Sequence, residues 1–179
     1  MGLVFIASAT ASGSATLEFT SGIDSTYNEY QFYFVNLHPQ TQHVHPQFQV
    51  NVAGASGFNE TITSTHFVAY ANEGDSDTTL AYSSSHDQGQ GTAYQNLFYN
   101  LDYENDDSCS GILTLYNPSS TTYVKHFVST MQGNHHTSAY SMVSHVAGYI
   151  NVTAAIDEIS FKMDTGNIDA GTIHMYGVG

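Results

Sequence analysis

Apolar and polar side chains alternate along this chain with a period of two, and almost no stretch shows the 3.6-residue period of a helix. The clearest case is 47–52, where Gln47, Gln49 and Asn51 alternate without error with three apolar residues. In a β-strand successive side chains point to opposite faces, so this pattern predicts a strand with one buried face. The chain is therefore constrained to a β-rich fold.

Many further segments have strand character, and only a single helical turn near Ser21–Asn28 is conceivable. The predicted strands are Leu3–Ala7, Ala15–Phe19, Tyr30–Leu37, Gln47–Val52, Thr61–Tyr70, Tyr94–Leu101, Gly111–Tyr116, Tyr123–Met131, Val146–Val152, Ile156–Met163 and Gly171–Tyr176. About ten short strands separated by turns indicate an all-β sandwich or barrel. We expect one domain, 1–179, since the length suits one domain and no linker or internal repeat is evident.

Three turn segments connect predicted strands. Asn117–Thr121 contains Pro118, which fixes φ, and it predicts a hairpin. Ala53–Gly57 is a small-residue turn after which Thr61–Tyr70 is expected to return beside the preceding strand. Asp164–Gly171 is expected to close another hairpin. The Gly- and Ser-rich segments Asn72–Thr79, Ser83–Gly91 and Tyr103–Ser110 are predicted to be long exposed loops.

Tyr30–Leu37 is apolar on both of its faces. Such a strand is expected either at the centre of a sheet that is covered on both sides, or with one face buried against another subunit.

The charge balance excludes whole classes of function. Lys125 and Lys162 are the only permanent cations, against 16 carboxylates, and the net charge is −14. Nucleic-acid binding and attachment to an anionic membrane both require clusters of Lys and Arg, so we expect neither. No apolar run approaches transmembrane length. Both lysines lie in predicted strands, and Lys162 is expected to pair with Glu158 or with a cross-strand acid.

Histidines provide the best candidates for a metal site. His43 and His45 would lie on the same face of a strand, with His38 nearby, and could converge on one ion. The competing interpretation is that they are surface histidines preceding a strand, because Pro46 follows directly and no acidic ligand occupies the position that a cupin motif requires. The adjacent pair His135 and His136 is expected at an exposed loop tip. We predict no metal ligands.

Two acidic segments could supply oxygen ligands to calcium, but neither matches an EF-hand loop, and solvated acidic loops are the simpler interpretation. They contain Glu73, Asp75 and Asp77, and Asp102, Glu104, Asp106 and Asp107.

No catalytic motif is present. Gly54–Gly57 is one residue short of a nucleophile elbow, and the acidic neighbours of Cys109 would raise its pKa and suppress nucleophilic character. The carboxylates offer no evident glycosidase pair. We therefore predict no enzyme activity, no catalytic residues and no cofactor.

Tyrosine and amide side chains keep carbohydrate binding in consideration. Tyr99, Tyr103 and Tyr140 lie in or near predicted loops, where their faces could stack against sugars. The alternative is that these tyrosines belong to an interface or to the edge of the core.

Three segments carry a resemblance to a known group of proteins: Thr20–Tyr30, Asn117–Phe127 and Phe161–Gly177. In order and spacing they resemble virion structural proteins of marine tailed phages, often those infecting cyanobacteria. The resemblance extends from about Leu3 to Gly177 and contains no catalytic motif. It implies a β-sandwich of jelly-roll type, displayed as an oligomer on the particle.

The expected function is therefore a non-enzymatic virion structural protein, an appendage, fibre or capsid decoration, located at the particle surface. Its expected partners are further copies of itself, with a trimer favoured, and other virion proteins. The alternative is a lectin-like module that binds host-surface glycans.

Overall fold

The computed structural model describes residues 2–135 and 139–179, and these residues form two antiparallel sheets without any helix. We call them the large and the small sheet. The large sheet has nine strands, in the order β1 (Leu3–Thr10), β13 (Ile168–Val178), β3 (Glu29–Pro39), β9 (Cys109–Tyr116), β10 (Lys125–His135), β11 (Tyr140–Ile150), β5 (Ile62–Asn72) and β6 (Thr78–Tyr82), with β7 (Gly89–Gly91) also pairing with β5. The small sheet has four, in the order β2 (Leu17–Phe19), β12 (Ile156–Met163), β4 (Pro46–Val52) and β8 (Gln95–Asn96). The predicted all-β sandwich is confirmed.

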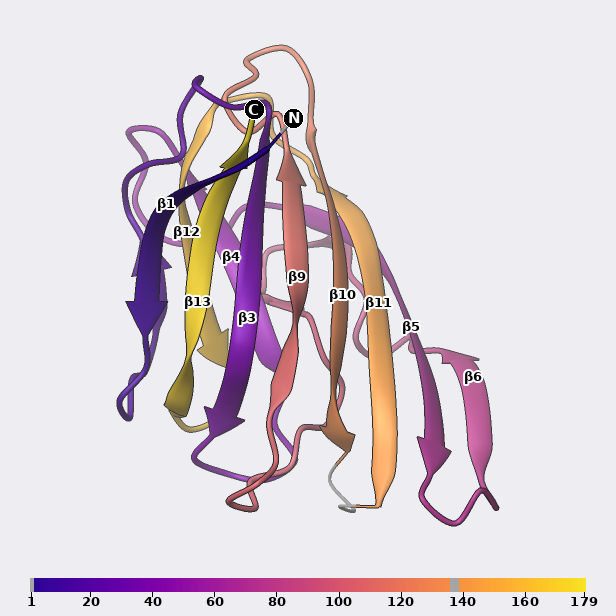
Figure 1. Ribbon diagram of the computed structural model, residues 1–179. Helices are drawn as coiled ribbons and strands as arrows, with labels where there is room; N and C mark the ends of the chain where they lie inside the picture. The colour runs from indigo at the N-terminus through magenta and orange to yellow at the C-terminus, as the bar shows by residue number, and fades with distance from the viewer. Residues whose placement is uncertain (1, 136–138) are drawn as a thin grey trace.

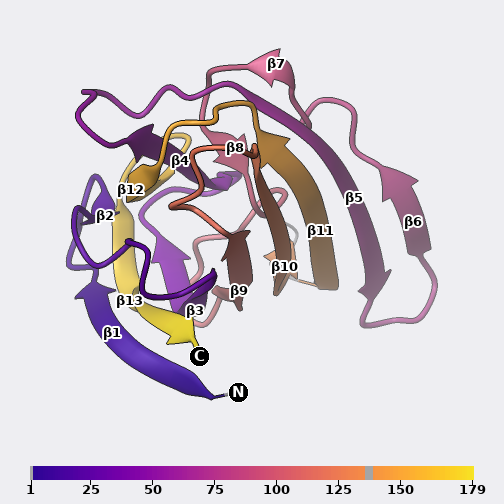
Figure 2. The ribbon, with the colours of Figure 1, turned by 90° about the horizontal axis from the view of Figure 1, so that it is seen from above.

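The small sheet covers only part of the large one. Figure 1 looks onto the large sheet with β4 and β12 behind it, and Figure 2 shows β5 and β6 extending beyond the small sheet. An irregular segment, residues 83–101, lies over the remaining inner face near β5. It contains β7, β8 and the buried side chains of Leu97, Phe98 and Leu101. The inner space thus has a sheet-covered half and a half covered by this segment.

Aromatic side chains fill the sheet-covered half. The ring of Phe161 on β12 lies 5.5 Å from that of Phe32 and 5.2 Å from that of Phe34, both on β3. Phe48 on β4 contacts Phe127 on β10 at 5.0 Å. All of these side chains are buried, as alternation predicts for the facing surfaces of two packed sheets.

Hydrogen bonds from buried amides hold the covering segment in place. Nε2 of Gln49 on β4 donates to the carbonyls of Glu60, Thr92 and Ala93. Gln95 donates to the carbonyls of His86 and Asn96. An irregular backbone that is buried has no ladder partners, so side chains must satisfy its carbonyls.

Lys125 is fully buried, with its Nζ 2.7–3.2 Å from the carbonyl oxygens of Tyr123, Val152, Thr153 and Ala154. It shares the inward face of β10 with Phe127, as expected, but Tyr123 lies outside the strand and is exposed. Burial lowers the pKa of Lys125. The amine therefore ties two loops together.

Lys162 is not paired with an acid among the described residues. Its Nζ lies 4.5 Å from the centre of the Tyr94 ring, and Glu158 instead accepts a hydrogen bond from Asn51. The expected pairing with Glu158 or a cross-strand acid is wrong, because two residues four apart on one strand are about 13 Å from each other and the opposite strand presents Gln47.

Most strand predictions are confirmed to within a few residues, but two of the three connections differ. Asn117–Thr121 does join β9 and β10 as a hairpin. The Ala53–Gly57 turn leads instead from β4 in the small sheet to β5 in the large sheet, and Asp164–Gly171 likewise leads from β12 to β13. Gly166 in this connection has a positive φ of 72°, and Gly171, at an irregularity in the pairing of β13 with β3, has one of 109°.

The expected strand Tyr94–Leu101 is mostly irregular, with only Gln95–Asn96 paired as β8. Conversely, β6 begins at Thr78 within one predicted loop, and β7 forms within another. Residues 21–28 contain bends and no helical turn.

Candidate functional site

A pocket of about 400 Å³ lies at the edge of the segment-covered half, where β10 ends and β11 begins. We call it the tyrosine pocket. Its lining comes from β5, β6, the ends of β10 and β11, and the covering segment, and comprises Val68, Tyr70, Asp77, Thr79, Ala81, Tyr82, Ser83, Tyr99, His135 and Tyr140. Its volume falls within the range of about 300–1,000 Å³ typical of small-molecule sites.

Four aromatic rings in the pocket contact one another: Tyr70, His135 and Tyr99 form a wall, and Tyr140 stands at its side. The rings of Tyr70 and Tyr140 are 5.4 Å apart, centre to centre, and nearly perpendicular. His135 lies 6.2 Å from Tyr70 and 5.6 Å from Tyr99. This arrangement follows from strand register, because Tyr140 is opposite both His135 and Asn72 on neighbouring strands.

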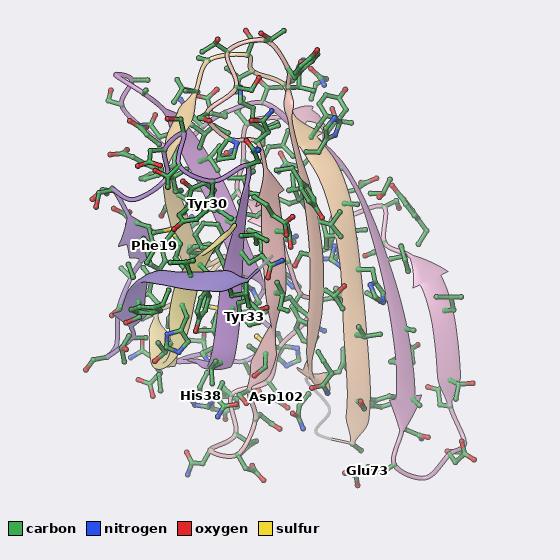
Figure 3. The ribbon with its side chains drawn as sticks, turned by 45° about the horizontal axis from the view of Figure 1, so that its top comes forward. Phe19, Tyr30, Tyr33, His38, Glu73 and Asp102 are labelled. Atoms are coloured by element: carbon green, nitrogen blue, oxygen red, sulfur yellow. The ribbon has the colours of Figure 1, made fainter. Side chains whose placement is uncertain are left out.

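A tight turn places a carboxylate beside this wall. Asn72 ends β5, and its Oδ1 accepts hydrogen bonds from the backbone amides of Ser76 and Asp77. Oδ2 of Asp77 in turn accepts a hydrogen bond of 2.9 Å from the hydroxyl of Tyr140, which raises the pKa of that tyrosine. Figure 3 shows the tip of this turn at Glu73, at the same end of the molecule as Asp102 and His38.

Three histidines lie behind Tyr99. The ring of His86 is 4.7 Å from those of both Tyr99 and His45, and 5.8 Å from that of His66. Nδ1 of His45 accepts a hydrogen bond from the backbone amide of Asn100, and Nδ1 of His86 is 2.8 Å from the hydroxyl of Ser83. His66 is fully buried, and neither of its ring nitrogens has a hydrogen-bond partner.

Burial keeps these histidines neutral. It lowers the pKa of His66 to about 4, with a further contribution from the neighbouring charge of His86. Burial also lowers the pKa of His86 and of His45, although in His45 the carboxylate of Asp164 opposes the shift. A charged imidazole is costly in a buried site, so acid must destabilise this region.

The outer face of the large sheet is the second notable surface. Two cross-strand rows that span the sheet define it: Ser8, His174, Tyr33, Ile112, Thr130, His145, Phe67 and Tyr82 in one, and Phe5, Tyr176, Gln31, Thr114, Val128, Ala147 and Thr65 in the other. Neither row contains a carboxylate or a lysine. We call this surface the uncharged face.

Apolar side chains on the uncharged face are left open to solvent. Phe5, Phe67 and Val128 are 40–56% exposed, and Val35, on the outer side of β3 beyond the two rows, is 44% exposed. The strand Tyr30–Leu37 shows the asymmetry most clearly, since Tyr30, Phe32 and Phe34 are buried and Val35 is exposed. The expectation that this chain alone covers both faces of the strand is therefore wrong.

The candidate histidine ligands do not converge. Nδ1 of His38 is 2.8 Å from the carbonyl of Asp107, His43 has a positive φ of 62° and is exposed, and His45 points towards Tyr99. Among residues 2–135 and 139–179, no group of three or more His, Cys, Asp or Glu side chains is placed to hold a metal. His135 ends β10 and faces the tyrosine pocket rather than forming a loop tip, and His136 lies outside the described residues.

The two acidic segments differ in burial. Glu73, Asp75 and Asp77 are exposed, as expected, whereas Asp102 and Asp107 are only 4% and 5% exposed. Burial, followed by the charges of nearby acids beginning with Asp102, raises the pKa of Asp107. The second segment is thus partly internal, contrary to the prediction of an exposed loop.

Cys109 is 1% exposed, and burial raises the pKa of its thiol to about 12. A thiol with so high a pKa is not a nucleophile at neutral pH.

Of the three tyrosines considered for sugar binding, the structure brings Tyr99 and Tyr140 into one pocket, while Tyr103 is exposed outside it. Tyr70, Thr79 and the buried His66 were missed. Tyr70 and His66 occur in a predicted strand with no local feature that separates them from core residues.

The chain matches no protein-family model, and no curated protein or solved structure matches it. None of the described segments is a helix of the length and apolar character needed to cross a membrane.

Proposed function

We propose that this protein is a non-enzymatic virion structural protein that assembles with copies of itself through the uncharged face and is displayed at the particle surface. The observation that carries the proposal is the absence of any lysine or carboxylate from both rows of that face, in a chain whose net charge is −14.

Charge determines where two copies can meet. Two chains of −14 repel each other, and contact between surfaces rich in carboxylates would also require desolvation of those groups. The uncharged face lowers both costs, since among the described residues carboxylates border it only where Glu29 accepts a hydrogen bond from Gln31 and Asp87 accepts one from Tyr82. Its exposed Phe5, Phe67 and Val128, together with tyrosines, have the composition of interface centres, which are depleted in charge and enriched in aromatic residues.

The strand order supports a jelly-roll core for this assembly. β1, β2, β3 and β4 alternate between the large and small sheets, and the orders β1-β13-β3-β9 and β2-β12-β4-β8 place early strands beside late ones. We assign these strands to a jelly roll, which the pairs β5–β6 and β10–β11 extend. Such double sheets occur in viral capsid and lectin domains, so this fold alone does not decide the function. The resemblance of three segments to phage virion proteins favours the former.

Sedimentation equilibrium tests the assembly. We expect the mass of an oligomer, a trimer being favoured, and dissociation to a folded monomer in Val128→Glu, because each copy would bury a carboxylate in the interface. Ser56→Glu, which adds the same charge on an exposed turn, should assemble normally. A wild-type monomer, or normal assembly of Val128→Glu, would contradict the proposed interface.

The virion location has a separate test. Mass spectrometry of gradient-purified particles, with immunogold electron microscopy, should detect the chain at the particle surface. Its absence from particles would overturn the assignment to the virion.

A further inference from the structure

The tyrosine pocket has a chemistry that the structural role does not use. Its lining contains no lysine, and the two lysines of the chain are engaged elsewhere, Lys125 in a buried site and Lys162 against Tyr94. A phosphate, sulfate or carboxylate ligand would meet Asp77 and a strongly negative protein without a compensating cation. The ligand is therefore not an anion.

The geometry of the rings disfavours a cationic ligand. An aromatic cage for an ammonium group surrounds the cation with separate ring faces. Here the ring of His135 is inclined by only 19° to that of Tyr70 and by 31° to that of Tyr99, so these three rings form one wall, and Tyr140 alone stands nearly perpendicular at its side. A continuous aromatic wall fits a ligand with one apolar face, such as the C–H face of a sugar ring.

Polar groups beside the wall suit the hydroxyls of such a ring. Asp77 is exposed and uses Oδ2 for Tyr140, and a carboxylate has capacity for further donors. Thr79, directly opposite Tyr70 on β6, adds a hydroxyl that both donates and accepts. The hydroxyls of Tyr70 and Tyr99 have no hydrogen-bond partner among the described residues.

We propose that the tyrosine pocket binds a neutral sugar ring, with its aromatic wall against the C–H face of the ring and with Asp77 and Thr79 bonded to its hydroxyls. The inference goes beyond the structural role and does not depend on oligomerisation. It places a glycan-binding site at one end of the sandwich, where of the pocket's lining residues Tyr82 alone also belongs to the uncharged face.

A glycan array is the first test. It should carry neutral hexose- and N-acetylhexosamine-terminated oligosaccharides alongside sialylated and sulfated ones, and we expect binding only to members of the neutral set. The strongest binder is then titrated by isothermal titration calorimetry, because only four of the 13 tyrosines line the pocket and tyrosine fluorescence would not report on it alone. Titration of the Val128→Glu variant as well separates a failure of glycan binding from a failure of assembly.

Pocket variants locate the site. Asp77→Asn changes an exposed side chain and should weaken binding about tenfold, since a hydrogen bond to a charged group contributes about 1.5–3 kcal/mol. Thr79→Val, which keeps the shape, and Tyr99→Ala should also weaken it, each with folding confirmed by circular dichroism. The matched control is Tyr103→Ala, an exposed tyrosine outside the pocket, which should bind normally.

Three results would overturn the proposal. These are the absence of binding to any neutral glycan, tighter binding of sialylated glycans or of tetramethylammonium, and normal binding by both Asp77→Asn and Tyr99→Ala.

Discussion

The two halves of the inner space are built on the same large sheet but have different covers, and their interiors differ accordingly. Under the small sheet the interior consists of contacting phenylalanines, such as Phe161 against Phe34. Under residues 83–101 it contains the polar side chains of Gln95 and His66, both fully buried, beside Leu97 and Phe98. A strand satisfies its own backbone through the ladder, whereas an irregular segment needs side-chain partners. The comparison teaches that a regular cover permits a purely apolar interior, whereas an irregular cover brings polar side chains into the interior beside its apolar ones.

The largest expected effect lies in the sheet-covered half. Phe161→Ala removes a ring that contacts Phe32 and Phe34, and it should lower the free energy of unfolding by about 4 kcal/mol in urea denaturation. Leu80→Ala, at a side chain that is 76% exposed, should change it by less than about 0.5 kcal/mol. Equal effects of the two substitutions would mean that this half is not a tightly packed core.

Acid should act on the segment-covered half. The pKa of His66 is about 4 in the folded protein, against about 6.5 when unfolded, so folding favours the neutral ring. The contribution of the neutral His66 ring to the free energy of unfolding is complete above about pH 6.5. On the order of 3 kcal/mol of this contribution is lost as the pH falls towards 4. Urea denaturation of the wild type and of His66→Leu at pH 7 and pH 4.5 should show a weaker pH dependence in the variant.

The control for this prediction is His126→Leu, which changes an exposed histidine and should retain the pH dependence of the wild type. If His66→Leu were as sensitive to acid as the wild type, His66 would not be the group responsible.

Removal of a buried amide should loosen the irregular cover alone. Gln49→Met leaves the carbonyls of Glu60, Thr92 and Ala93 without this donor, and it should lower the free energy of unfolding by about 2 kcal/mol. Hydrogen exchange should accelerate in residues 92–101 more than in β12. Gln47→Met, on the same strand, removes only a contact with the side chain of Asn96 and should leave this exchange slow. Uniform acceleration in both sheets would contradict a separate role for the amide.

The smallest effect is expected at the boundary between the two covers. Lys162→Met removes the ammonium over the Tyr94 ring, a half-exposed cation–π contact of about 0.5–1 kcal/mol. A melting-temperature shift of about one to four degrees is expected for this chain length. A much larger shift would show that Lys162 has a partner other than the ring.

The sequence predicts the sheet-covered half better than the segment-covered half. Alternation identifies β3, β4 and β12 because each has one face against the core, and β12 has the predicted boundaries Ile156–Met163. It does not reveal which sheet a strand joins, so the turn Ala53–Gly57 was misread as a hairpin. The order of strands depends on contacts between residues far apart in the chain, which no local pattern records.

The tyrosine pocket illustrates the same limit. Tyr99 and Tyr140 were identified from their chemistry and their position near predicted loops, but Tyr70 and Thr79 join them only through the pairing of β5 with β6 and β11. The segment 94–101 was predicted as a strand because it is apolar. Its burial is real, but it results from insertion of Leu97 and Phe98 into the core rather than from pairing.

The placement of the two lysines has a consequence for proteolysis. Trypsin cleaves after Lys and Arg, and this chain offers two such bonds, after Lys125 in β10 and after Lys162 in β12. Lys125 is buried against four carbonyls, and both bonds lie within paired strands that a protease cannot bind in an extended form. Cleavage at Lys125 therefore requires opening of the large sheet. The rate of tryptic digestion becomes a direct measure of that opening, and the folded protein should survive a protease that digests most proteins of its size.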